Sequence, residues 1–173
     1  MLPRLVALVK DHADVICRHA MQEIQQAAHL EQLRGLPQLG CRKLLQQITE
    51  DLGSCLAPGN HDWLLSRWRE FGRLCFENSV PLHEAIHALH ILKAKIIGFL
   101  DDQGLLQTSL ELYSEKEFEH LLGRLVESLV YQVVCGYERA MLDAVHALPV
   151  MCQILLPHGK KSELVASGSE ALG

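Results

Sequence analysis

The segment that most constrains the fold of this chain is residues 81–100, PLHEAIHALHILKAKIIGFL. It opens on a proline, whose fixed φ suits the first turn of a helix, and Gly98 is its only other helix breaker. On a helical wheel, one apolar group lies roughly opposite a second: Leu82, Ile86, Leu89, Ile96 and Leu100 against Ala85, Ala88, Leu92 and Phe99. Because a helix that is apolar on two sides is buried on two sides, we expect this segment to be the central helix of a bundle.

The remaining apolar residues also favour helices. Hydrophobic residues make up 49 % of the chain but aromatic residues only 5 %, so the core must be built from Leu, Ala, Val and Ile. No segment has the β-branched, period-two alternation of a strand. A chain of 173 residues suits a single domain. The sequence therefore predicts an all-α helical bundle with a globin-like or four-helix-bundle-like core.

Apolar periodicity and stop signals divide the chain into five main helices, at residues 3–33, 39–56, 61–78, 81–100 and 114–148. Asn60 and Ser79 are expected to cap helices, and Ser114 begins an S-x-x-E capping box. Pro149 should interrupt the last helix, and residues 150–156 can add a short sixth. We expect residues 1–148 to form the helical domain, and residues 149–173 a short apolar turn and a flexible tail rich in Gly and Ser.

The first of these helices would be about 45 Å long at 1.5 Å per residue. That is more than a compact monomer needs. We therefore expect its far end to lie in a subunit interface, and the protein to be a homodimer.

Charge and cysteine usage restrict the location and the partners. The net charge is −5 and the basic residues are scattered, which gives no attraction to nucleic acid. No apolar run approaches the roughly 18–20 residues that cross a bilayer, and Lys10 and Asp11 come too early for a signal peptide. The six cysteines contain no CxxC pair. We expect a cytoplasmic protein with reduced thiols and no membrane or nucleic-acid partner.

Three histidines, His83, His87 and His90, form a stripe at i, i+4 and i+7 of the expected central helix. At 100° per residue they stay within about 60° of one another. Residues at i and i+4 can share a metal ion, and one helix histidine suffices as a haem ligand, so a metal- or haem-binding sensor is one hypothesis. The alternative is that the three histidines form a polar seam of a packed helix. We expect no cofactor because we favour this alternative.

Residues 83–87 also spell H-E-x-x-H, the spacing of two zinc ligands and a glutamate base. A zinc protease would need a third ligand, for which Glu115, Glu117 and Glu119 are candidates by position alone, and a sheet edge that holds substrate. No strand is predicted, and the sequence contains no G-x-S-x-G, P-loop or G-x-G-x-x-G motif. We therefore expect no enzymatic activity.

Residues 90–94, His-Ile-Leu-Lys-Ala, resemble the H-x-L-K-G core of histidine phosphotransfer domains, which are small four-helix bundles. The resemblance implies that His90 would carry the phosphoryl group and that Lys93 would lie beside it. Ala94 replaces the glycine that leaves room for a receiver domain, and the apolar flanks could cover His90. Exposure of His90 to solvent is the property that tests this hypothesis.

Aromatic and basic residues gather in residues 61–78, where Trp68, Arg69 and Arg73 are candidates for a surface that binds a partner. The alternative is that the tryptophans of this segment belong to the core and its arginines to the solvated face.

Residues 68–137 together resemble the N-terminal domain of the RsbT co-antagonist (RsbR-like) proteins. The matching stretches are Trp68-Arg69-Glu70-Phe71-Gly72-Arg73, Val80-Pro81-Leu82-His83-Glu84-Ala85 and Val134-Cys135-Gly136-Tyr137-Glu138. The resemblance implies a non-enzymatic, dimeric sensory or regulatory module of bacterial stress signalling, which in longer relatives precedes a STAS or other output domain. No output segment follows residue 148 here, so we expect the chain to signal by binding a protein partner.

Overall fold

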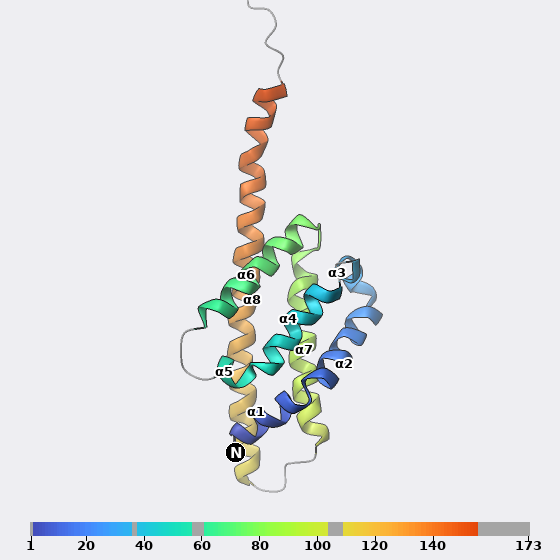
Figure 1. Ribbon diagram of the computed structural model, residues 1–173, viewed down its shortest axis with the longest axis vertical. Coiled ribbons are helices and arrows are strands. Elements are labelled where there is room, and N and C mark those ends of the chain that lie inside the picture. The colour runs from blue at the N-terminus through green and yellow to red at the C-terminus, as the bar shows by residue number, and fades with distance from the viewer. Residues whose placement is uncertain (1, 36–37, 57–60, 104–108, 156–173) are drawn as a thin grey trace, which may run out of the picture. The chain divides into compact units, whose positions relative to one another are not determined.

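The computed structural model describes the backbone of residues 2–35, 38–56, 61–103 and 109–155, and the side chains of 2–35, 42–56, 61–103 and 113–147. All regular structure in these residues is helical, which confirms the all-α prediction (Figure 1). The elements are α1 Leu2–Asp11, α2 Ala13–Gln26, the 3-10 helix η1 Ala28–Leu30, α3 Glu31–Gly35, α4 Gln38–Glu50, α5 Leu52–Leu56, α6 Asp62–Glu77, α7 Leu82–Asp102 and α8 Ser109–Leu155. None of the described helices is both long and apolar enough to span a bilayer.

The chain divides into two compact units, Met1–Met141 and Leu142–Gly173. The bundle and its core belong to the first unit. In the second unit the structure describes the last part of α8. Most of the predicted tail, residues 156–173, lies outside the described residues.

Helix α7 is central to the first unit, as predicted. It contacts α1, α2, α3 and α6, and Lys95 of α7 forms an ion pair with Glu23 of α2. Both of its predicted apolar groups contribute buried residues: Leu89, Ile96 and Leu100 from one, and Ala85, Ala88 and Leu92 from the other. At 100° per residue the two groups are adjacent rather than opposite, so they form one broad buried face and not two.

The prediction of one long first helix is wrong. The chain breaks at His12, whose φ and ψ are −114° and 17°, and again at Ala27, which is extended. At the first break the backbone N–H of His12 donates to the carbonyl oxygen of Val9 and not to that of Leu8, as a continuous helix would require. The ring Nδ1 of His12 lies 2.9 Å from the Leu8 carbonyl oxygen and takes the place of this amide. Both α1 and α2 pack on α4 and α7, and α1 also packs on α5. The argument for a subunit interface from the length of this helix therefore fails.

Other predicted helix ends also differ. Residues 39–56 form two helices, with a break at Asp51. Ser79 has a φ of 58°, and α7 begins after Pro81 without a side-chain cap. Asn60 lies outside the described residues.

Helix α8 is longer than predicted at both ends. It starts at Ser109 rather than Ser114, and it continues through Pro149 to Leu155. Ser114 is therefore a buried residue within the helix and no N-cap. Pro149 removes one backbone donor from the helix but does not end it.

Helices α6 and α8 cross with their backbones in contact, through one glycine on each helix (Figure 1). A Cβ on Gly72 would lie 2.1 Å from the Val133 carbonyl oxygen, and one on Gly136 would lie 1.8 Å from the Arg69 carbonyl oxygen. The guanidinium of Arg69 also donates to Oε1 of Gln132 on α8, at 2.6 and 3.0 Å. Position 136 must therefore be small, because the backbone of another helix touches it.

Candidate functional site

The three histidines of α7 are exposed. His83, His87 and His90 all lie on the solvent side of the helix, and the residues between them, such as Ala85 and Ala88, face the core. The stripe is therefore no seam of a packed helix. Its imidazoles are accessible to a ligand or a phosphoryl donor.

The H-E-x-x-H sequence does not assemble a protease site. Glu84 is buried, and its Oε2 accepts a hydrogen bond of 2.8 Å from the backbone N–H of Leu33, in the first turn of α3. The carboxylate therefore satisfies a helix-end donor inside the bundle instead of lying beside His83 and His87. Among the residues with described side chains, no group of three or more His, Cys, Asp or Glu is placed to hold a metal ion.

A fourth histidine joins the stripe from another element. His29 of η1 lies against His87, with ring centroids 4.7 Å apart and ring planes at 83°. Both side chains are exposed. Sequence spacing gave no signal for this pair, because it depends on how η1 folds back onto α7.

The residues of the phosphotransfer hypothesis differ in their surroundings. His90 is exposed, although its flanks are apolar. Lys93 is half-buried, and its Nζ lies 3.5 Å from the point that a Cβ on Gly123 of α8 would occupy. The lysine therefore extends across α8 at a place where that helix carries no side chain.

The three candidate partner residues on α6 differ in exposure. Trp68 is only 2 % exposed and packs edge-to-face on Phe71 at 5.3 Å, so this candidate belongs to the core. Its indole Nε1 is buried and has no hydrogen-bond partner among the residues that the structure describes. Only Arg69 and Arg73 of the candidates reach solvent, and Arg69 is held by Gln132.

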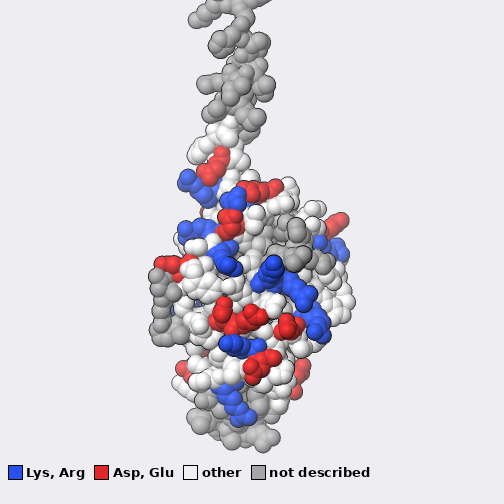
Figure 2. Space-filling model, viewed as in Figure 1, with Lys and Arg blue, Asp and Glu red and all other residues white. Residues whose placement is uncertain are grey.

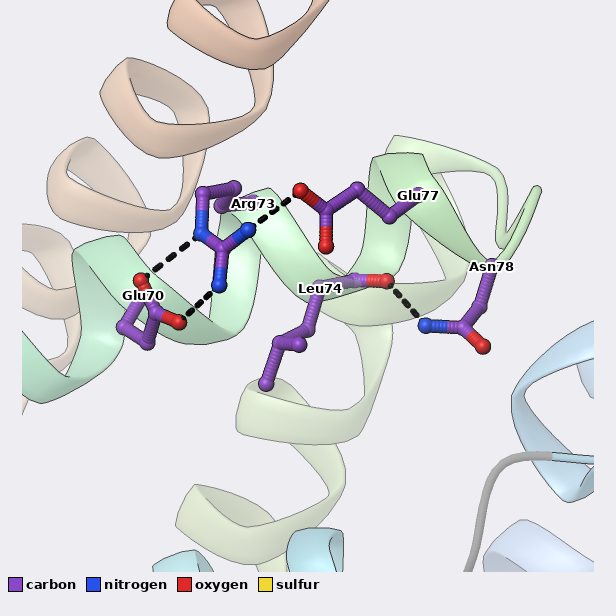
Figure 3. Close-up of polar contacts among 5 residues, drawn as sticks. All are labelled: Glu70, Arg73, Leu74, Glu77 and Asn78. Carbon is purple, nitrogen blue, oxygen red and sulfur yellow. Dashed lines mark hydrogen bonds and ion pairs between the residues drawn. The ribbon is translucent and has the colours of Figure 1, made fainter.

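Arg73 is held by acidic residues of its own helix (Figure 3). It forms ion pairs with Glu70 and Glu77, one turn to either side, and its Nε donates to Glu70 at 2.9 Å. The hydrogen bond from Arg73 lowers the pKa of Glu70. On the face drawn in Figure 2, basic and acidic side chains of the described residues are likewise interspersed. The positive charge of Arg73 is thus largely offset on the surface of α6.

Exposed apolar side chains on α8 are a feature that the sequence analysis missed. In the first unit, Tyr131 is 64 % and Met141 42 % exposed. In the second unit, Leu142 is 47 % and Val145 54 % exposed. A hydropathy pattern could not identify them, because α8 alternates apolar positions along its whole length and only packing shows which are covered.

Comparison of the chain with protein-family models, with curated proteins and with solved structures gave no match in any of the three.

Proposed function

We propose that this protein is a non-enzymatic sensory or regulatory helical domain, which acts through protein–protein contact in bacterial stress or two-component-type signalling. It works as a cytoplasmic homodimer around a globin-like or four-helix-bundle-like core. The resemblance of residues 68–137 to the RsbR-like N-terminal domains supports this assignment. So does the inward position of Glu84, which removes the base from the H-E-x-x-H sequence.

The observation that carries the proposal is the pair of exposed apolar residues Leu142 and Val145. They lie three residues apart, so they share one face of the helix. All residues from Leu142 to Ala147 are exposed, and a short helical segment without apolar cover is only marginally stable in water. A second helix that packs on this face, as in a coiled coil, would cover both side chains.

Sedimentation equilibrium of the full chain tests the proposal. The wild-type protein should sediment at twice the chain mass of 19.4 kDa. The double variant Leu142→Glu, Val145→Glu should sediment as the single chain, because a glutamate cannot be buried without a partner. The double variant Ala144→Glu, Ala147→Glu is the matched control: it adds the same two charges on the opposite face of the same helix and should remain a dimer. A wild-type monomer, or a double variant that dimerises as tightly as the wild type, would refute the homodimer.

The exposure of His90 favours a second function, a histidine phosphotransfer protein that uses His90 with Lys93. In this case an aspartyl phosphate of a receiver domain transfers its phosphoryl group to an imidazole nitrogen of His90, and the ammonium of Lys93 offsets the charge. Incubation with a phosphorylated receiver domain should yield an acid-labile, base-stable phosphate on the chain. His90→Gln should abolish the label and His83→Gln, an exposed histidine of the same helix, should retain it. No label on the wild-type chain would exclude the phosphotransfer function.

A further inference from the structure

Two imidazoles from separate elements meet on the surface of the first unit. His29 lies in η1 and His87 in the middle of α7, and their ring centroids are 4.7 Å apart. Both rings are exposed, so neither is packed in place by the core. Rings this close can hold one ligand between them, because each imidazole offers a nitrogen that binds metal ions.

We propose that His29 and His87 together bind one divalent transition-metal ion of the Ni²⁺ and Cu²⁺ class, with water in the remaining positions. Imidazole is the protein ligand that suits these ions. Binding would join η1 to α7. The site does not depend on the partner surface of α8.

The separation of the two rings fits this class of ion. With metal–nitrogen bonds of about 2.1 Å, each ring centroid lies ~3.2 Å from the ion. A centroid separation of 4.7 Å then corresponds to a nitrogen–metal–nitrogen angle of about 95°, close to the right angle of square-planar and octahedral ions. Because both side chains are exposed, rotation about χ2 can turn one nitrogen of each ring onto the ion.

The position of the pair gives metal binding a structural consequence. Leu33 and Glu84 already join α3 to α7 by a hydrogen bond, within one turn of His29 and His87 along each segment. A metal ion on the histidine pair would add a second link at the same junction. Because the ion binds only where the two segments are together, it should stabilise the folded chain.

Titration of the untagged chain with Ni²⁺, followed by isothermal calorimetry at neutral pH, tests the proposal. The wild type should bind one ion with micromolar affinity, as expected for two imidazoles (about −8 kcal/mol at 1 μM). His29→Ala and His87→Ala should each weaken binding by at least ~10-fold, since even changes outside the ligand set cost 10–100-fold. His90→Ala, an exposed histidine of the same helix, is the matched control and should bind as the wild type does.

His83→Ala separates this site from a pair formed within α7 alone. His83 and His87 have the i, i+4 spacing that can itself chelate an ion. The proposal expects His83→Ala to bind normally, and expects Ni²⁺ to raise the Tm of that variant but not of His29→Ala. Normal binding by His29→Ala, or no binding by the wild type, would overturn it. Circular dichroism of each variant shows that lost binding is not lost folding.

Discussion

Gly136 allows the sharpest test of how the bundle is packed. A Cβ at this position would lie 1.8 Å from the carbonyl oxygen of Arg69 and 2.8 Å from its carbonyl carbon. Carbon and oxygen approach no closer than about 3.3 Å even in favourable contacts, so α6 and α8 would have to separate by ~1.5 Å. The obstructing atoms belong to the backbone, and no side-chain rotation can relieve the contact. Overpacking of this kind lowers the free energy of unfolding by about 3 kcal/mol.

The greater helix propensity of alanine offsets about 1 kcal/mol of this cost. We therefore expect Gly136→Ala to lower the free energy of unfolding by about 2 kcal/mol, as measured by urea unfolding with linear extrapolation. Gly98→Ala, near the C-terminal end of α7, is the matched control, because none of the described neighbouring atoms lies within 4 Å of the added Cβ. It should stabilise the protein by up to about 1 kcal/mol. If Gly136→Ala is as stable as Gly98→Ala, the close contact of α6 with α8 is refuted.

Three further predictions concern buried groups. Glu84→Ala should lower stability by about 1–3 kcal/mol in urea unfolding, because the N–H of Leu33 loses its buried acceptor, and Glu84→Gln, which keeps an acceptor oxygen, should lose less. Burial and then Asp101 raise the pKa of Glu115 above its ordinary 4.5. The contribution of Glu115 to stability is therefore full below pH 4.5 and is lost as the pH rises through the raised pKa. Glu115→Gln should flatten the pH dependence of the unfolding free energy in that range, and an unchanged slope would contradict this. Burial raises the pKa of the Cys55 thiol to about 11, so alkylation at pH 8 followed by peptide mass spectrometry should label Cys55 much faster in the unfolded chain than in the native one.

The sequence was sufficient to predict the helical class and the central helix. The apolar residues of α7 form one broad face, and that face is buried because other helices pack against it. The side chains of Cys17, Cys55 and Cys75 are also buried. These features follow from periodicity and composition, which local sequence records directly.

Helix breaks could not be predicted in the same way. No glycine or proline marks the ends at His12, Ala27 or Asp51, and the apolar stripe continues across the first two. The shorter pieces on either side of each break still pack against the rest of the bundle. At Pro149 the reverse holds, since a strong local breaker does not end α8. In each case the wider structure overrides the local preference of the residue.

The histidine stripe shows how the neighbours of a helix decide what a motif can do. Successive residues of α7 are rotated by about 100°. Once Ala85 and Ala88 face the core, the adjacent Glu84 is drawn inside, while His83 and His87 are left in solvent. The carboxylate of Glu84 is therefore buried and accepts a hydrogen bond at the start of α3. The imidazoles of the motif are exposed, and that of His87 contacts His29. The same junction of α3 and η1 with α7 accounts for both outcomes, so a substitution that loosens it, such as Glu84→Ala, should also weaken Ni²⁺ binding at the histidine pair.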